Sequence, residues 1–243
     1  MNIAIVGGTG TVGREAATEL KRRGHAVQVL SRSNGVDLRR DLGDALVGAE
    51  VVVHAANGDR ELLVGGSARL LAAAPDAHHV LISVIGADRV PRGHFAHKLA
   101  QEELLRAAGA AFTILRATQL HPYVAGVLRR AARFGVLPSG PLPLQPVDAA
   151  EVGRALADIA EAEPSRAVAR LAGAEILALT ELARRWRAAT GAHALAVSLP
   201  LPGATGRALR AGALTDPAAW RGRVRFADWL GPGARLEPAG APT

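Results

Sequence analysis

The chain of 243 residues contains no cysteine, which excludes a disulfide framework and thiolate chemistry. Although 49% of its residues are hydrophobic, none of the apolar runs reaches the ~18 residues expected of a membrane span. Met1 opens directly into an apolar segment, so we expect no charged leader with a cleavage site. These absences predict a soluble, cytoplasmic protein that does not bind a membrane.

Aromatic side chains are also scarce, at 3% of the sequence, and lysine occurs only at Lys21 and Lys98. The net charge of +7 therefore comes mainly from arginines, which are scattered along the chain instead of forming a stripe. Because no aromatic residues alternate with the basic ones, nothing favours stacking on bases, and we expect no nucleic-acid partner. An anionic cofactor or substrate is a natural use of the excess positive charge.

The strongest positive signal lies at the N-terminus. The apolar run 2–6 leads into the glycine-rich segment 7–13 (GGTGTVG), and residues 14–23 read as a helix that ends at Gly24. Strand, glycine turn and helix is the arrangement that binds a dinucleotide pyrophosphate at the helix N-terminus, where four N–H groups lack partners. We therefore predict a dinucleotide site with these loop ligands: Gly7, Thr9, Gly10, Thr11, Val12 and Gly13.

Strand-like and helix-like segments alternate through the first half of the chain. The predicted strands are 26–30, 51–55, 80–84 and 112–116, and the predicted helices are 42–47, 60–74 and 95–108. Repeated βα units with nearly continuous apolar strands imply a parallel sheet with helices on both faces. The predicted fold class is α/β, a Rossmann-type doubly wound parallel sheet with a smaller C-terminal α/β lobe.

Beyond residue 134 the pattern changes. Residues 135–143 read as a Pro/Gly loop of the kind that borders ligand clefts, and 149–162 reads as a helix with Asp148 and Glu151 at capping-box spacing. A strand at 167–171, a helix at 179–190 and a strand at 194–199 are expected in the smaller lobe. We therefore predict a dinucleotide-binding domain over 1–145, a small substrate-binding lobe over 146–230 and a flexible tail over 231–243.

The end of the second strand decides which dinucleotide is preferred. An acidic residue there would bind a ribose 2′-hydroxyl and repel a 2′-phosphate, but this chain has Ser31-Arg32-Ser33. Arg32 can make charge-assisted contacts to a 2′-phosphate, and the hydroxyl of Ser31 can add a hydrogen bond. The sequence therefore predicts NADP(H) as the cofactor.

Other cofactor contacts are expected from the ends of neighbouring strands. Asp37 and Leu38 could bracket the adenine ring, although Asp37 could equally be an ordinary loop residue. Small residues after the third strand would let the backbone approach the ribose, and the fourth strand ends near the expected nicotinamide position. These candidates are Ala55, Ala56 and Asn57 after the third strand, and Ser83, Val84 and Ile85 at the fourth, with Ile85 assigned to the substrate.

Several of these segments together resemble a known family. The matching segments are the glycine loop 7–13, VVVHAA at 51–56, LISVIGADR at 81–89, KLAQE at 98–102, FTILRATQ at 112–119 and PVD at 146–148. In this order the sequence resembles the NmrA-like, NAD(P)H-binding group of atypical short-chain dehydrogenase/reductases, over nearly the whole chain. The resemblance implies that Lys98 binds the cofactor ribose and that Arg116 has a structural role.

The resemblance also marks a departure. Many relatives carry a tyrosine four residues before the helix lysine as the proton donor, whereas this chain has His94 there. His94 could itself be the acid, since an ordinary histidine titrates near neutrality. Alternatively His97 could serve, or no side-chain acid is needed because hydride delivery to a conjugated acceptor can take its proton from water.

A last group of candidates follows the strand at 112–116. Thr118, Gln119 and His121 are expected near the substrate, and Tyr123, the only tyrosine, is a possible proton donor. The same segment could instead cap a helix that begins at Pro122. No cluster has the spacing of metal ligands, so we expect no metal, and nothing suggests a Ser–His–Asp arrangement.

The sequence thus predicts an NADPH-dependent reductase that acts on a small organic carbonyl, enone or quinone-like substrate. The catalytic candidates are His94, Lys98 and Tyr123. Two alternatives remain: a non-catalytic NADP(H)-binding redox sensor of the NmrA type, and a redox-neutral enzyme that keeps the cofactor site. We expect a monomer or homodimer whose partner is a small molecule.

Overall fold

The structure, a computed structural model, describes residues 1–90, 92–198 and 200–231. These residues form two compact units, each assembled from two separate stretches of sequence. The first unit contains Met1–Arg116 and Ala149–Ala169, and the second contains Ala117–Asp148 and residues 170–231. The chain therefore leaves the first unit and returns to it, unlike the consecutive division at residue 145 that we predicted. Apart from Gly231, the predicted tail lies outside the described residues.

A seven-stranded sheet forms the centre of the fold, in the order β11-β8-β5-β4-β3-β1-β2. β1 pairs in parallel with β2 on one side and with β3 on the other, and β3 pairs in parallel with β4. The strand order reverses at β1, which is the topological switch point where open α/β sheets bind ligands. The strands are β1 (Asn2–Val6), β2 (Ala26–Leu30), β3 (Val51–His54), β4 (His78–Val84), β5 (Phe112–Ala117), β8 (Val168–Ala172) and β11 (Trp220–Arg221).

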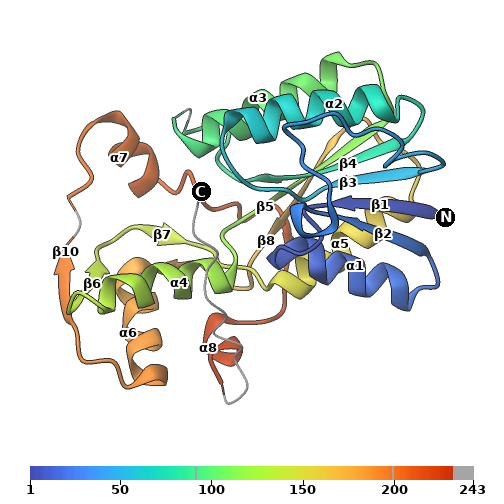
Figure 1. The fold of residues 1–243 in the computed structure, drawn as a ribbon. Coiled ribbons are helices and arrows are strands. Elements are labelled where there is room, and N and C mark those ends of the chain that lie inside the picture. The colour runs from blue at the N-terminus through green and yellow to red at the C-terminus, as the bar shows by residue number, and fades with distance from the viewer. Residues whose placement is uncertain (91, 199, 232–243) are drawn as a thin grey trace. The chain divides into compact units, whose positions relative to one another are not determined.

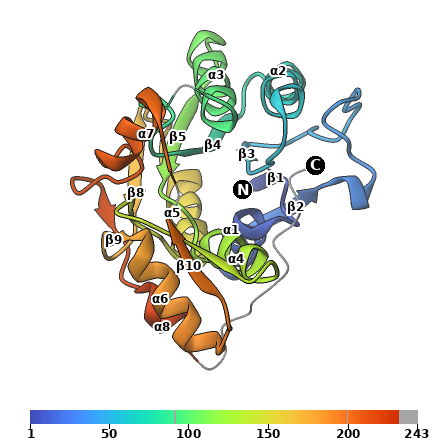
Figure 2. The ribbon, with the colours of Figure 1, turned by 90° about the vertical axis from the view of Figure 1, so that its left-hand side faces the viewer.

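Helices cover both faces of this sheet, as the doubly wound prediction requires. α1 (Thr11–Arg22) and α5 (Ala149–Glu161) lie on one face, and α2 (Gly66–Ala73) and α3 (His94–Ala107) lie on the other (Figures 1 and 2). Residues 3–6 of β1 and all of β3 are almost completely buried between these layers, because both sheet faces are covered. The predicted α/β, Rossmann-type fold class is confirmed.

α1 and α5 approach each other closely because one contact position is a glycine. A Cβ atom added to Gly153 of α5 would lie only 2.6 Å from the Cβ atom of Glu15 and 2.8 Å from the backbone nitrogen of Ala16. α1 buries Val12, Gly13, Ala16, Ala17 and Leu20 on its inner face. These mostly small residues fix the position of α1, whose N-terminus follows the glycine loop.

Two local predictions in the first unit are corrected by the structure. Residues 43–48 form consecutive turns, so the helix predicted at 42–47 is absent. Leu42 and Leu46 are buried at helical spacing, but Gly43 and Gly48 adopt left-handed conformations that interrupt a helix. The helix expected over 60–74 begins as a π-helical turn, Glu61–Gly65, and becomes α-helical only in α2.

The second unit contains the helices α4 (His121–Ala132), α6 (Leu179–Thr190), α7 (Gly203–Arg210) and α8 (Phe226–Trp229). α6 has the predicted bounds and ends at Gly191 in the left-handed conformation, as a C-terminal glycine cap does. α4 begins with Pro122 in its first turn, where a missing N–H costs nothing.

The segment 135–143, predicted as a loop, also contains short strands. β6 (Val136–Ser139) pairs in parallel with β10 (Leu195–Ser198), and β7 (Pro143–Leu144) pairs antiparallel with β9 (Leu177–Ala178). The strand predicted at 167–171 for the smaller lobe forms as β8, but it pairs within the seven-stranded sheet. In the part of the chain that the structure describes, no helix is long and apolar enough to span a membrane.

Candidate functional site

The glycine loop after β1 is held tightly against two neighbouring strands. The N–H of Gly7 donates to the carbonyl of Leu30 at 2.9 Å, and the N–H of Gly10 donates to the carbonyl of Gly7 at 2.9 Å. Gly7 has φ of 78°, and a Cβ atom there would lie 2.5 Å from the backbone nitrogen of Ala56. A side chain at this position would clash, so the loop presents backbone atoms at the carboxyl edge of the sheet.

α1 begins directly after this loop, and its N-terminus is the positive end of the helix dipole. Gly10 is its N-cap, no side chain of the described residues caps it, and its first turn contains no acidic residue. Basic residues Lys21 and Arg22 lie in the last turn, where they complement the opposite end of the helix dipole. Free N–H groups with a favourable dipole suit an anion such as a pyrophosphate. The cradle and its charge therefore fit the predicted cofactor.

Arg32 begins a short 3₁₀ turn, Arg32–Asn34, directly after β2. Its side chain is exposed, and among the described residues no ion pair or hydrogen bond of its guanidinium is found. The hydroxyls of Ser31 and Ser33 lie 2.7 Å apart, so the two serines are bonded to each other. The turn thus presents an unpaired cation and two hydroxyls at the position where the fold places the second ribose.

The adenine candidates have different environments. Leu38 is buried in a core cluster with Leu42, Leu46 and Leu70, so its side chain packs inward. The carboxylate of Asp37 accepts a hydrogen bond from the backbone N–H of Arg39 at 3.0 Å. These contacts stabilise the turn itself, and the adenine role of both residues stays a prediction.

The residues after β3 lie beside the glycine loop. The N–H of Ala55 donates to the carbonyl of Val6 at 2.8 Å, and the backbone of Ala56 lies against Gly7. Ala55 and Ala56 are half-buried and Asn57 is exposed. The structure therefore brings Ala55 and Ala56 together with the loop, at the edge where the ribose was predicted, and Asn57 follows them in the chain.

The end of β4 contains a buried ion network. Ser83 donates to Glu102 at 2.5 Å, and Arg116 donates to both carboxylate oxygens of Glu102 at 2.8 Å. Arg106 also donates to Glu102, and Arg116 reaches Asp88 at 2.7 Å. Burial opposes ionisation of Glu102, but these donors outweigh it and lower its pKa. The contacts give Arg116 a structural role, and they turn the hydroxyl of Ser83 towards Glu102.

Lys98 lies on α3 and is 4% exposed. Its ammonium donates to the carbonyl of Ile82 at 3.0 Å and to Oε1 of Gln101 at 3.1 Å. Burial lowers the pKa of Lys98 to about 8, although the charge of Glu102 acts in the other direction. The lysine is thus held at the end of β4 by two oxygen acceptors, which leaves its third N–H for a ligand.

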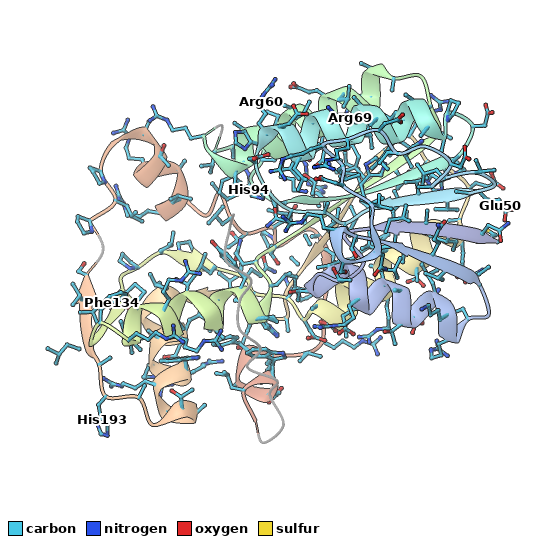
Figure 3. The ribbon with its side chains drawn as sticks, in the orientation of Figure 1. Glu50, Arg60, Arg69, His94, Phe134 and His193 are labelled. Carbon is cyan, nitrogen blue, oxygen red and sulfur yellow. The ribbon has the colours of Figure 1, made fainter. Side chains whose placement is uncertain are left out.

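His94 is the first residue of α3 and lies at the opposite edge of the sheet from Glu50, which precedes β3 (Figure 3). His94 is exposed, but neighbouring atoms partly desolvate its ring. This desolvation, with the charges of Lys98 and His97, lowers the pKa of His94 to about 4. The imidazole is therefore neutral at pH 7, which suits a proton acceptor better than a proton donor.

Three of the predicted substrate and catalytic residues belong to the second unit. Gln119 donates to the carbonyl of Leu214 at 2.8 Å, and His121 is fully buried with its Nε2 atom 3.0 Å from the carbonyl of Pro146. Tyr123 is 62% exposed on α4. Gln119 and His121 are thus engaged in contacts that stabilise their own unit, and their substrate role stays a prediction, as does that of Tyr123.

The remaining candidates lie at the end of β4 in the first unit. Ile85 is buried and Val84 is half-buried. Two polar groups in this region were missed by the sequence reasoning: Gln101 and His54, both buried. Two features of the sequence could have indicated them: a histidine in an otherwise apolar strand, and an amide at a position on the inner face of α3.

The comparisons with known proteins place the fold. No protein-family model matches the chain, and no curated protein matches it in sequence. Among solved structures, the NADPH-dependent quinone oxidoreductase of Escherichia coli in complex with NADPH has a TM-score of 0.78 and 19% identity, with 94% of this chain and 98% of that one covered.

Two further structures have similar scores. UDP-glucose 4-epimerase of Thermotoga maritima with UDP-glucose has a TM-score of 0.75 and 18% identity, with 98% of both chains covered. A dTDP-4-dehydrorhamnose reductase of Clostridium acetobutylicum has a TM-score of 0.69 and 16% identity, with 95% of this chain and 91% of that one covered. At these identities the likeness establishes a shared Rossmann-type fold.

Proposed function

We propose that the first unit binds NADP(H) and that the protein is an NADPH-dependent reductase of a small quinone-like, enone or carbonyl compound. The observation that supports this most directly is the glycine loop, which presents backbone atoms and the uncapped N-terminus of α1 at the switch point of the sheet. The resemblance to NmrA-like proteins and the quinone oxidoreductase among the structural neighbours point in the same direction.

The chain offers a separate group for each part of the cofactor. The glycine loop and the first turn of α1 would hold the pyrophosphate, Arg32 and Ser31 the 2′-phosphate, and Lys98 the nicotinamide ribose. When bound, NADPH supplies a hydride to the acceptor. The protein's own residues would then orient the cofactor, exclude water and hold charge at fixed positions.

The protonation of the product narrows the substrate class. A ketone reduced to an alcohol needs a proton donor near its oxygen, and His94 is a weak one at pH 7 because its pKa is lowered to about 4 and the ring is neutral. A quinone or enone spreads the added charge by conjugation and can take its proton from water. Among the predicted substrates, quinones and enones are therefore favoured over simple ketones.

One feature favours a second candidate function. The tyrosine that many relatives place four residues before Lys98 is replaced by His94, and a protein that binds NADP(H) without turnover has no need of an acid. A redox sensor of the NmrA type would have this property. A redox-neutral enzyme is the third possibility, since an epimerase shares the fold.

A turnover assay separates these functions. The purified chain is mixed with NADPH and a panel of quinones, enones and simple ketones, and loss of the reduced nicotinamide absorbance is recorded. The reductase proposal predicts acceptor-dependent NADPH oxidation, faster with quinones and enones than with ketones. Tight NADPH binding without oxidation by any acceptor would reject the reductase and leave the sensor and the redox-neutral enzyme.

A further inference from the structure

A continuous chain of hydrogen bonds runs through the interior of the first unit and ends at Lys98. It joins α3, α2, β3 and β4, and α2 and α3 cover the same face of the sheet (Figure 1). In order, its links are Lys98 Nζ to Gln101 Oε1 at 3.1 Å, Gln101 Nε2 to Ser67 Oγ at 2.8 Å, Ser67 Oγ to His54 Nδ1 at 3.1 Å, His54 Nε2 to His79 Nδ1 at 2.9 Å, and His79 Nε2 to the carbonyl of Ala74 at 2.9 Å.

The chemistry of the two ends fixes the direction of every link. The carbonyl of Ala74 can only accept, so Nε2 of His79 carries a proton and its Nδ1 atom accepts from His54. Nδ1 of His54 then accepts from the hydroxyl of Ser67, and that hydroxyl accepts from the amide of Gln101. The amide oxygen of Gln101 is thereby turned towards the ammonium of Lys98, which can only donate.

We propose that Ser67, His54 and His79 are positioning residues for Lys98, which act by locking the side-chain amide of Gln101 with its oxygen towards the ammonium. The role of Lys98 as a ribose ligand rests on the proposed function. The positioning of the ammonium involves only side chains of the protein and does not depend on a bound cofactor.

The lock matters because the ammonium is buried. The four other side chains in this series of hydrogen bonds are buried as well, with an exposed fraction of 3% or less: Gln101, Ser67, His54 and His79. If the amide of Gln101 turned over, its NH₂ group would face the ammonium, and a buried charge would lose one of its two oxygen acceptors. Both histidines are kept neutral, since burial lowers the pKa of each. Protonation of either ring would add a donor where the chain requires an acceptor.

The other charged and titratable groups around the ammonium do not replace this link. Glu102 on α3 favours the charged lysine, but its two oxygens are occupied by Ser83 and two arginines. His94 and His97, also on α3, are nearby, and the charge of Lys98 opposes protonation of His94. His54 on β3 and His79 on β4 are connected to the lysine only through the chain of hydrogen bonds, and both rings are neutral. Gln101 and the carbonyl of Ile82 are therefore the acceptors that hold the ammonium.

The sequence allows a direct test, because Lys21 and Lys98 are the only lysines. With isotope-labelled lysine, an NMR pH titration gives two side-chain signals. Lys21 is in the exposed last turn of α1 and serves as the internal reference, and the variant Lys21→Arg identifies its signal. Ser67→Ala removes the middle link of the hydrogen-bond chain. The control, Thr113→Val, removes a buried hydroxyl that is bonded to His78 at 3.0 Å and takes no part in that chain.

The expected result is that Ser67→Ala raises the acid dissociation constant of the Lys98 ammonium by about tenfold or more, since a hydrogen bond to a charged group is lost or weakened. Thr113→Val leaves it unchanged. If Ser67→Ala does not fold, Gln101→Met tests the same link and must shift the constant in the same direction. A Lys98 titration that is unaltered in the folded variant would overturn the proposal.

The experiment uses no cofactor, so its outcome is independent of the proposed function. NADPH titration of the same samples gives the second readout: weaker NADPH binding in Ser67→Ala, with Thr113→Val as the control, would connect the positioning to the ribose site. Failure of wild-type protein to bind NADPH would reject the proposed function and leave the lysine titration as the test of positioning.

Discussion

At the scale of single residues, the arginines of the first unit have different surroundings. Arg39 forms an ion pair with Asp59 at 2.7 Å, and Arg69 bridges Glu61 and the carbonyl of Leu38. Arg32 is exposed, and no partner of its side chain is found among the described residues. A cation that stabilises no fold contact is available for a ligand, which is why the cofactor preference is assigned to Arg32.

The first prediction is therefore made for Arg32→Ala. NADPH binding should weaken about ten- to hundredfold, because hydrogen bonds to charged groups contribute ~1.5–3 kcal/mol each, while NADH binding should change little. Calorimetric titration of both nucleotides measures this, with the exposed Arg40 changed to alanine as the control. An equal loss for both nucleotides, or the same loss in Arg40→Ala, would contradict the assignment.

The second prediction concerns His94. Since its pKa is lowered to about 4, His94 is the neutral imidazole at pH 7, a much weaker proton donor than the imidazolium. His94→Ala should therefore retain turnover of a quinone acceptor between about pH 5 and pH 9, the range in which an ordinary histidine changes charge. If His94→Ala instead loses turnover, with a pH dependence that fits one ionisation in this range, and His193→Ala does not, His94 is the acid after all.

At the scale of elements, the glycine loop combines two constraints that can be separated. Gly7 and Gly35 both have positive φ, 78° and 83°, but a Cβ atom on Gly7 would meet backbone at 2.5 Å whereas nothing lies within 4 Å of one on Gly35. Both are thus limited by conformation, but only Gly7 is also limited by space. The second limit reflects the close contact between the loop after β1 and the residues after β3.

The third prediction compares these two glycines. Gly35→Ala should lower the free energy of unfolding by ~1–2 kcal/mol, the cost of a left-handed alanine. Gly7→Ala should cost ~1–3 kcal/mol more, since the added methyl group overpacks the site, and it should also weaken NADPH binding. Urea denaturation measures both. Equal destabilisation of the two variants would show that the loop has room for a side chain.

How far elements follow from sequence depends on what determines them. β2 and α6 have the predicted bounds because local apolar patterns and a terminal glycine specify them. Residues 42–47 were misjudged, since buried leucines at helical spacing can also pack from a series of turns. The chain from Lys98 to His79 could not be predicted at all: its hydrogen bonds join residues from two helices and two strands, and their directions depend on tertiary contacts.

At the scale of the whole molecule, several histidines are buried without charge. His78 is 7% exposed and His121 is completely buried, and burial lowers the pKa of each to about 4. In the unfolded chain a histidine titrates near ~6.5. Below that pH the unfolded state binds protons that the folded state does not, so stability falls as the pH decreases from about 6.5 to about 4.

The fourth prediction follows from this sign. The free energy of unfolding should decrease by up to ~1.4 kcal/mol per pH unit for each such histidine in this window, measured as the urea midpoint against pH. His121→Asn should reduce the slope, whatever it does to the midpoint at pH 7, and the exposed His193→Asn serves as the control. A midpoint that is constant between these pH values would contradict the account of the buried rings.

The division of the molecule shows where sequence reasoning stops. The alternation of strands and helices was enough to predict a doubly wound parallel sheet. It was not enough to show that Ala149–Ala169 belongs to the same unit as the N-terminus, while the intervening stretch Ala117–Asp148 belongs to the other. Such a return depends on long-range contacts, for example the one at Gly153, where α5 packs on α1.

The central claim is that the first unit holds NADP(H) on its glycine loop with Arg32 at the 2′-phosphate. The most direct test is an equilibrium titration of the wild-type chain with NADPH and with NADH at the same ionic strength. We expect a Kd for NADPH at least about tenfold lower than that for NADH, since Arg32 contributes only to binding of the phosphorylated nucleotide. Equal dissociation constants, or no binding of either nucleotide, would contradict it.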